Sequence, residues 1–198
     1  MSEPGNLYAS CYLAEPADPG HLHELPFVAT AALYAAIATL LSGLELQLAI
    51  KWPNDLTYGG AKVSGILIES RTGTDGRNGV VIGFGVNCRH HPQIDDYPTT
   101  DLSEITGRAL EPMAMFEALS SALTDRLSLW ARGSGFSAIR QYWLQHAHPP
   151  GTDMAVTLPE GRITGRFDGV DGGGRLILRT DDGQQRIISA GDVAIMKV

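Results

Sequence analysis

The sequence has 198 residues, which suits one medium-sized domain or a domain with a small appendage. Hydrophobic residues make up 43% and charged residues 19%, which excludes a disordered chain. Fifteen Lys and Arg against 22 Asp and Glu give a net charge of -7, so there is no overall positive field for a nucleic acid. Two cysteines cannot support a disulfide framework and favour a cytoplasmic protein.

The first part of the chain predicts a strand followed by a helix. Residues 5–14 favour a strand, and residues 26–42 show helical spacing of their large apolar side chains. The uncharged stretch 25–44 is long enough to cross a bilayer. Its alanines and hydroxyl residues favour a buried core helix instead. Because no basic residue precedes Lys51, we expect neither a membrane span nor a secretory signal.

Short connections join the strands that follow, which predicts antiparallel pairing. The connections are a turn at Gly59-Gly60 and a polar stretch at 71–78. An irregular region at 89–110, with one short helix, precedes two further helices. The expected strands are 46–52, 62–69 and 79–87, and the expected helices are 111–132 and 136–146.

The texture of the sequence changes after Pro149-Pro150-Gly151, where short β-rich runs alternate with Gly and Asp turns. We therefore expect two domains, 1–148 and 151–198, of which the second is a small all-β module. Its expected strands are 154–158, 162–168, 175–180, 185–189 and 192–197.

The densest group of chemically useful residues is the run 51–55, Lys-Trp-Pro-Asn-Asp, with Lys62 seven residues further on. Two ammonium groups that converge on one site would balance the charge of a phosphate. A carboxylate beside them would hold a lysine in place or bind Mg²⁺ through oxygen. The alternative is a solvated hairpin end, in which residues 53–55 form a simple turn.

The expected strand 79–87 has two different faces. Period-two alternation places its bulky side chains on one face and Gly83, Gly85 and Asn87 on the other. Two glycines leave bare backbone on which a flat ligand can lie while the Asn87 amide bonds its edge. Gly65, in the neighbouring strand, suggests the same arrangement. The alternative is a strand packed so tightly beneath a helix that only glycine fits.

Several stretches of the sequence resemble the biotin protein ligase family. The run 51–56, Lys-Trp-Pro-Asn-Asp-Leu, with Lys62 and residues 64–69, resembles the family signature. Residues 4–10 resemble its Gly-Asn-Leu-Tyr strand, and residues 82–87 its Gly-x-Gly-(Ile/Val)-Asn strand. The tail from 165 to 192 resembles its C-terminal SH3-like barrel. This resemblance implies an α+β fold of the class II aminoacyl-tRNA-synthetase type, with a mixed sheet and helices followed by that barrel.

The resemblance also implies an enzyme, a biotin–[acetyl-CoA-carboxylase] ligase. Biotin and Mg·ATP give biotinyl-5′-adenylate and pyrophosphate, and a lysine of a biotin carrier domain then attacks the acyl carbon and releases AMP. The implied partners are biotin, ATP with Mg²⁺ and the carrier domain of a carboxylase, with no nucleic acid and no membrane, and the family allows a homodimer. A lipoate or octanoate ligase shares the fold, but the Lys-Trp-Pro-Asn-Asp string favours biotin.

Roles for single residues follow from the same resemblance. Lys62 is expected to contact the biotin carboxylate and the α-phosphate, and Asp55 to orient Lys62 or contact Mg²⁺, so these two are the catalytic candidates. Gly65 is expected to pass its backbone near the ureido end of biotin, and Trp52 to form pocket wall. The expected nucleotide-binding residues are Lys51, Asn54, Asp55, Gly83, Gly85 and Asn87.

The family's Gly- and Arg-rich loop, which precedes the Gly-Asn-Leu-Tyr strand, has no counterpart between Met1 and that strand. We expect weakened adenylation without it, since each electrostatic contact of this kind is worth about 10²–10³ in rate. We also expect an unpaired sheet edge or apolar face. The second hypothesis is therefore a non-catalytic protein that binds biotin or the adenylate, or acts as a partner subunit.

The run 88–91, Cys-Arg-His-His, attracts attention as a metal or nucleophile site. Its spacing fits no standard zinc site. No base for the cysteine can be located from the sequence. We expect an ordinary surface loop there.

Overall fold

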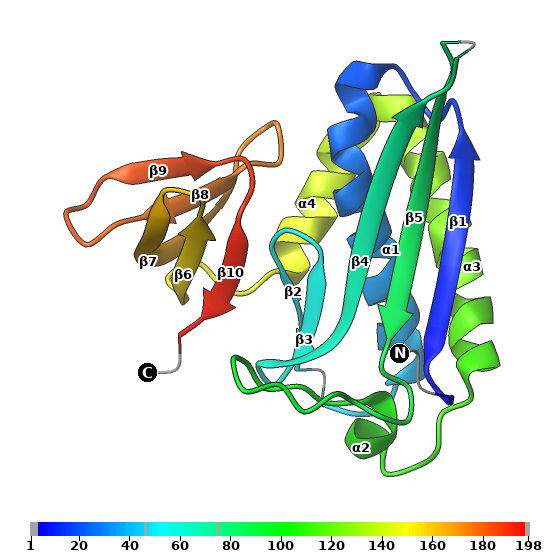
Figure 1. The fold of residues 1–198 in the computed structure, drawn as a ribbon. Helices are drawn as coiled ribbons and strands as arrows, with labels where there is room; N and C mark the ends of the chain where they lie inside the picture. Colours follow the sequence, from blue (N-terminus) through cyan, green and yellow to red (C-terminus); the bar gives the residue numbers. More distant parts are fainter. Residues whose placement is uncertain (1–3, 46, 75, 197–198) are drawn as a thin grey trace.

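The computed structural model describes residues 4–45, 47–74 and 76–196, which form two five-stranded sheets, the larger of which has helices packed on one face (Figure 1). The first half of the chain builds the larger sheet, and the last quarter builds the smaller one. Leu46 and Lys197, which end two of the expected strands, lie outside the described residues.

The larger sheet contains β1 (Leu7–Ala14), β2 (Leu48–Lys51), β3 (Asp55–Tyr58), β4 (Ala61–Thr72) and β5 (Asn78–Val86). Their spatial order is β1-β5-β4-β3-β2, and each neighbouring pair is antiparallel. Isolated parallel bridges join Ile50 to Ala147 and Lys62 to Thr99, so the pairing as a whole is mixed. Strand β3 is not predicted from the sequence, because Pro53 is expected to end the ladder; the chain instead turns at 52–54 and pairs again at once.

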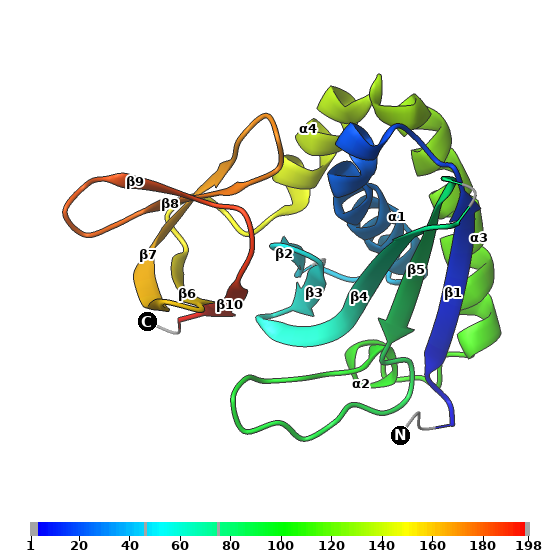
Figure 2. The ribbon, with the colours of Figure 1, turned by 45° about the horizontal axis from the view of Figure 1, so that its top comes forward.

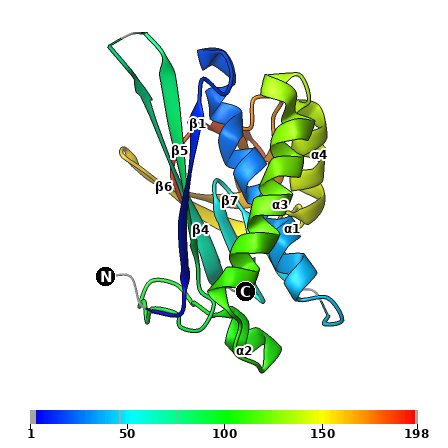
Figure 3. The ribbon, with the colours of Figure 1, turned by 90° about the vertical axis from the view of Figure 1, so that its right-hand side faces the viewer.

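Helices cover one face of this sheet, as the side view shows (Figure 3). Helix α1 (Leu25–Leu40) contacts both the sheet and α3 (Pro112–Trp130), and α4 (Phe136–His146) packs beside them. The stretch Pro19–Leu40 is long and apolar enough to cross a membrane, yet 67% of its most apolar window is buried inside the protein. That packing is what a core helix requires. Shorter helical segments are η1 (Pro19–Glu24), α2 (Leu102–Thr106) and η2 (Ala131–Gly133).

No helix of the described part of the chain covers the opposite face of the larger sheet (Figure 3). On the helix side, Val80, Ile82, Phe84 and Val86 of β5 are all buried, which confirms the predicted alternation. On the other side, large apolar side chains remain exposed and glycines lie between them. These exposed side chains are Tyr8, Tyr12, Leu67 and Val81. Among the described residues, β1 forms one edge of this sheet.

The smaller sheet is formed by β6 (Asp153–Leu158), β7 (Gly161–Val170), β8 (Leu176–Arg179), β9 (Gln185–Ile188) and β10 (Asp192–Ile195). Its order is β10-β6-β7-β8-β9, again with antiparallel pairs. Figure 2 shows it beside the β2–β3 end of the larger sheet. The five strands agree with those expected from the sequence to within a few residues.

Hydrogen bonds to backbone carbonyls hold the smaller sheet against the rest of the protein. Trp52 Nε1 donates to Gly174 O at 3.1 Å, and Lys51 Nζ donates to Val193 O at 2.7 Å. Arg140 of α4 donates to the carbonyls of Asp171 and Val170. The residues just before β3 therefore contact the second sheet directly, so its docking constrains the segment that carries Asp55.

We predict that Gly174→Ala loosens this docking. Gly174 has φ of +78°, and an added Cβ would lie 2.5 Å from Phe27 Cε2. We expect a loss of stability of about 1–3 kcal/mol and faster proteolysis at residues 148–151. Gly172→Ala in the same turn is the control, because its Cβ would meet nothing within 4 Å. Identical denaturation midpoints and cleavage rates for the two variants would contradict this account.

Candidate functional site

The candidate site contains one carboxylate that lies between two lysines. The β2–β3 register places Lys51 opposite Asp55, and the β3–β4 register places Asp55 opposite Gly65. Asp55 Oδ1 lies 2.7 Å from Lys62 Nζ, and Asp55 Oδ2 lies 3.0 Å from Lys51 Nζ. The side chains of Asp55 and Lys51 are each 12% exposed, whereas that of Lys62 is 28% exposed. Lys62 is therefore the more accessible of the two ammonium groups.

A hollow of about 320 Å³ opens beside Lys62 on the uncovered face of the larger sheet. Gly65 and Gly85, which pair across β4 and β5, contribute to its lining, as do Tyr8 and Asn87. A second hollow of about 560 Å³ shares Lys62 and both glycines with the first. It adds Asn54, Asp55, Gly83 and Asp192. The two hollows form one continuous surface along bare backbone.

Crowding by neighbouring atoms does not explain the glycines at positions 83 and 85. A Cβ at Gly83 would have Leu67 O as its nearest neighbour at 3.6 Å, and one at Gly85 would have Gly65 O at 3.8 Å, both ordinary contacts. Gly65 differs, since its Cβ would lie 3.2 Å from Asp55 Oδ1 and 3.4 Å from Lys62 Nζ. Gly65 therefore lets the ion pair lie close to the backbone, while Gly83 and Gly85 leave space for something else.

Residues 88–101, here called the covering loop, close one side of the first hollow. The loop is attached to Lys62 through its backbone: Lys62 N donates to Pro98 O at 2.8 Å, and Thr100 N donates to Lys62 O at 3.0 Å. The ring centre of Tyr97 lies 5.6 Å from Lys62 Nζ and 6.0 Å from Lys51 Nζ. A tyrosine face at this range attracts ammonium groups. Nothing in the sequence pattern singled out Tyr97.

The first residue of the covering loop is not a surface residue, contrary to expectation. Cys88 is fully buried, and burial raises the pKa of its thiol to about 11. A thiol in this state is neutral and inert at physiological pH. The tertiary contacts of the loop thus exclude the nucleophile that the sequence left open.

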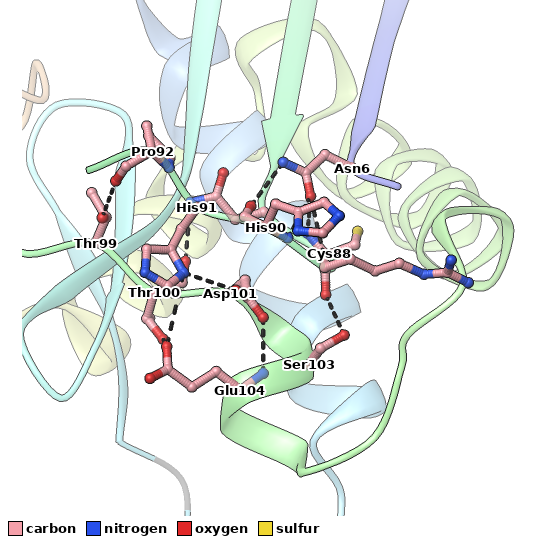
Figure 4. A network of polar contacts seen from close by, with 12 residues as sticks. Asn6, Cys88, His90, His91, Pro92, Thr99, Thr100, Asp101, Ser103 and Glu104 are labelled. Carbon is pink, nitrogen blue, oxygen red and sulfur yellow. Dashed lines mark hydrogen bonds and ion pairs between the residues drawn. The ribbon is translucent and has the colours of Figure 1, made fainter. Parts of the chain in front are cut away.

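Three side chains of this region lie close enough together to share a metal ion (Figure 4). Ligand atoms of His91, Asp101 and Glu104 are within 4.8 Å of one another. Each already has a protein partner: His91 Nδ1 is 2.8 Å from Asp101 Oδ2, the Glu104 amide donates to Asp101 Oδ1, and Thr100 Oγ1 donates to Glu104 Oε2. The contact between His91 and Asp101 joins the two ends of the covering loop.

Family models match both parts of this chain. The model described as "Biotin/lipoate A/B protein ligase family" matches residues 1–87, and that described as "Biotin protein ligase C terminal domain" matches residues 155–196. The biotin--[acetyl-CoA-carboxylase] ligase of Paracoccus denitrificans is 36% identical over 172 residues, which are 84% of this chain and 71% of the relative. The chain belongs to the biotin protein ligase family.

Other members of the family have a lower sequence identity to this chain, and a solved structure among them has the same fold. The bifunctional ligase/repressor BirA of Bacillus subtilis is 29% identical over 195 residues, or 96% of this chain and 58% of the relative. The biotin protein ligase from Aquifex aeolicus, solved in complex with biotin and ATP, has a TM-score of 0.81 at 24% identity, covering 99% of this chain and 81% of its own. The expected α+β ligase fold with a small C-terminal β-module of SH3-like type is therefore confirmed.

The structure brings most of the residues expected from the family signature to the open face. Lys62, Gly65 and Gly85 line both hollows, and Asn87 lines the first. The amides of Asn54 and Asn87 each already donate to a backbone carbonyl, of Ile66 and Thr100 respectively. Their side chains are thus held in place before any ligand arrives. The expected residues that line only the second hollow are Asn54, Asp55 and Gly83.

Two expected members of the site lie elsewhere. Trp52 is 3% exposed, bonds Gly174 and borders a different hollow, which lies between the start of α1 and the turn of the second sheet that carries Gly174, with Phe27 and Pro53. It is therefore not wall of the Lys62 hollow. Lys51 lines neither Lys62 hollow, because its ammonium group is occupied by Asp55 and Val193 O. Its role in this structure is to attach the site to the second sheet rather than to offer an open cation to a phosphate.

The charge of Lys51 also acts on His148, at the start of the connection to the second sheet. His148 Nε2 lies 2.9 Å from Thr57 Oγ1, and the His148 amide donates to Ile50 O at 3.2 Å. Burial of the ring, and then the nearby Lys51 cation, lower the pKa of His148 below its ordinary value of 6.5. The imidazole is therefore held neutral in the folded protein.

This shift predicts acid sensitivity. Below about pH 6.5 the unfolded chain protonates His148 first, so stability falls as the pH drops toward the lower pKa of the folded state. His148→Gln should reduce the difference in melting temperature between about pH 7.5 and about pH 5.5. His90→Gln, a change at an exposed histidine, serves as the control. An unchanged pH dependence in His148→Gln would rule out this origin.

A second prediction separates a ligand surface from a packing device. Gly85→Val adds a Cβ whose nearest neighbour lies at 3.8 Å, so we expect the fold to be retained and the stability to change by less than about 1 kcal/mol. Its methyl groups project into the hollow, so the affinity for Mg²⁺ with a non-hydrolysable ATP analogue, which Gly85 is expected to contact, should weaken at least about tenfold. Thermal denaturation and isothermal titration measure the two effects. A destabilised variant that binds the analogue as tightly as the unmodified chain would show that the glycine serves packing.

Proposed function

We propose that this chain activates biotin with ATP to biotinyl-5′-adenylate and transfers the biotinyl group to a lysine of a biotin carrier domain. The single observation that carries the proposal is the Lys62 ammonium group, paired with Asp55 at 2.7 Å on the bare-backbone face. Membership of the ligase family supports it, as does the Aquifex aeolicus relative, which was solved in complex with biotin and ATP.

In the first step, a biotin carboxylate oxygen attacks the α-phosphorus of ATP and pyrophosphate leaves. The attack brings the negative carboxylate against the α-phosphate oxygens, and the bonding electrons of the broken P–O bond leave with pyrophosphate. Lys62 supplies a positive charge to both groups at once, and Asp55 prevents the lysine from swinging into solvent. A preorganised cation of this kind typically contributes about 10²–10³ in rate, because it needs no reorganisation during the reaction.

In the second step, the neutral amine of a carrier lysine attacks the acyl carbon, AMP leaves with the bonding electrons of the anhydride, and the nitrogen releases one proton to water. The negative charge of Asp55 lies beside the path of the carrier lysine, which approaches as an ammonium ion before it loses its proton. The glycine backbone at Gly65, Gly83 and Gly85 would support biotin and the adenylate, and Asn54 and Asn87 would contact the nucleotide. The exposed face leaves room for the carrier domain to approach.

The geometry does not fit a divalent cation at Asp55. Both carboxylate oxygens already face ammonium groups, at 2.7 Å and 3.0 Å, and Mg²⁺ there would meet two like charges. We therefore propose that Mg²⁺ enters as the counter-ion of the ATP phosphates. No step of the mechanism is assigned to a metal bound by this chain.

We further propose a domain boundary at 148–151, between the last helix and the second sheet, and a cytoplasmic location, which both free thiols suit. A homodimer remains a proposal that rests on the uncharged edge strand β1, because an unpaired strand edge is a template for pairing. The alternatives are a non-catalytic binding protein and a lipoate or octanoate ligase.

The proposal predicts that Lys62→Gln lowers the rate of biotin-dependent adenylate formation by at least about 10²-fold. Lys51→Gln is the matched control: it removes a second lysine on the same carboxylate but opens onto neither hollow, so its effect on the rate should be smaller. Release of pyrophosphate from Mg·ATP with biotin measures the rate.

Other outcomes of this assay would favour a different function for the chain. Biotin binding without any pyrophosphate release would favour the non-catalytic hypothesis. Pyrophosphate release with lipoate or octanoate in place of biotin would favour the alternative acyl substrate. A Lys62→Gln variant as active as the unmodified chain would overturn the role of Lys62.

A further inference from the structure

The side chain of Asn6, just before β1, lies beside the start of the covering loop, because β1 pairs with β5 and Leu7 is opposite Val86 (Figure 4). Its Oδ1 accepts hydrogen bonds from three successive backbone amides, those of Cys88, Arg89 and His90, at 3.0, 3.1 and 3.2 Å. Its Nδ2 donates to His90 O at 2.8 Å. One amide side chain thus makes four hydrogen bonds to a segment that is more than 80 residues away along the sequence.

The local backbone is built for this contact. Gly5 has φ of +100°, a conformation that L side chains rarely adopt, and an added Cβ would lie 3.1 Å from Arg89 Cδ. The turn at Gly5 therefore brings the chain against the loop and directs Asn6 toward it. Only an amide side chain can accept from three N–H groups with one atom and donate to a carbonyl with the other.

The opposite side of the same segment is held by α2. Leu102 N donates to Asn87 O at 2.9 Å, and both the amide and the hydroxyl of Ser103 donate to Cys88 O. These bonds satisfy the carbonyls of residues 87 and 88, whereas the amides of 88–90 depend on Asn6. Cys88 is buried and Arg89 half-buried, so their amides must find acceptors, and Asn6 supplies one to both; removal of its side chain therefore destabilises the conformation of this segment.

We infer that Asn6 is a positioning residue for the nucleotide side of the site. Asn87 immediately precedes the bonded segment, and Tyr97 and Thr99 of the covering loop line the Lys62 hollow together with it. Asn6 itself borders the first hollow, but both polar atoms of its side chain bond residues 88–90, so it acts through that loop. It sets where the loop leaves β5 and so holds Asn87 and the loop against the hollow. This inference rests on the proposed function for its ligand and on the hydrogen bonds alone for its mechanism.

The test compares Asn6→Leu, which keeps the volume and loses all four bonds, with Asn6→Asp, which keeps the acceptor. In the chain without ligand, amide exchange at residues 88–90 should be at least about tenfold faster in Asn6→Leu and close to unmodified in Asn6→Asp. Isothermal titration of Asn6→Leu should show an affinity at least about tenfold lower for Mg²⁺ with a non-hydrolysable ATP analogue. Its biotin affinity should change less than about twofold.

Asn78→Leu is the matched control. Asn78 also accepts a hydrogen bond through its side chain, from Thr72 at 2.7 Å, but at the far end of the sheet. It should change neither affinity nor exchange at 88–90, even if it costs as much stability. That split between nucleotide and biotin is what a merely structural role would not produce.

Two results would overturn the inference: unchanged exchange at 88–90 in Asn6→Leu, or equal losses of nucleotide and biotin affinity in Asn6→Leu and Asn78→Leu. Failure of the unmodified chain to bind the nucleotide analogue would instead contradict the proposed function. Amide exchange in the unliganded chain would then still decide whether Asn6 holds the loop.

Discussion

The pairing of Asp55 with both Lys62 and Lys51 is the constraint on which the rest of the site depends. The Asp55 carboxylate is only 12% exposed, and two lysines from different strands lie within 3.0 Å of its oxygens. The two lysines make different further contacts. Lys62 opens onto the uncovered face, whereas Lys51 donates to a carbonyl of the second sheet. One carboxylate therefore links the reactive surface to the docking of the C-terminal module.

That link gives the small second sheet a physical part in the site. Its contacts to Trp52 and Lys51 lie directly before the turn that leads into Asp55. Asp192, at the start of β10, even borders the second hollow. A displacement of the second sheet would therefore disturb the ion pair that holds Lys62. The neutral His148 beside Lys51 belongs to the same junction, since a second cation there would repel the first.

The covering loop completes the opposite side of the surface, and hydrogen bonds hold both of its ends. Asn6 satisfies the amides at its start, and the backbone of Lys62 satisfies its end. Between these points Tyr97 lies near both ammonium groups. The loop is thus attached to the same lysine whose charge it covers. A ligand that enters between Lys62 and Asn87 meets groups already oriented by the protein.

The sequence by itself determined the order of helices and strands, the two faces of β5 and the cluster of Lys62, Asp55 and glycines. These features are local: period-two alternation sets which side chain faces the core, and the signature residues are close in the chain. Strand β3 was not predicted, because a proline normally ends a β-ladder, whereas here the chain pairs again immediately after Pro53.

Only the tertiary structure decided which of the neighbouring residues share a surface. Trp52 and Lys51 lie within four positions of Asp55 in the chain, yet both donate hydrogen bonds to the second sheet. Trp52, in the turn at 52–54, bonds Gly174 O, whereas the Lys51 ammonium group is shared between Asp55 and Val193 O. Asn6 and Tyr97, by contrast, join the site from 56 and 35 positions away from Lys62. Hydrogen bonds and cation–ring contacts of that separation leave no periodic trace in a sequence, since only folding brings their partners together.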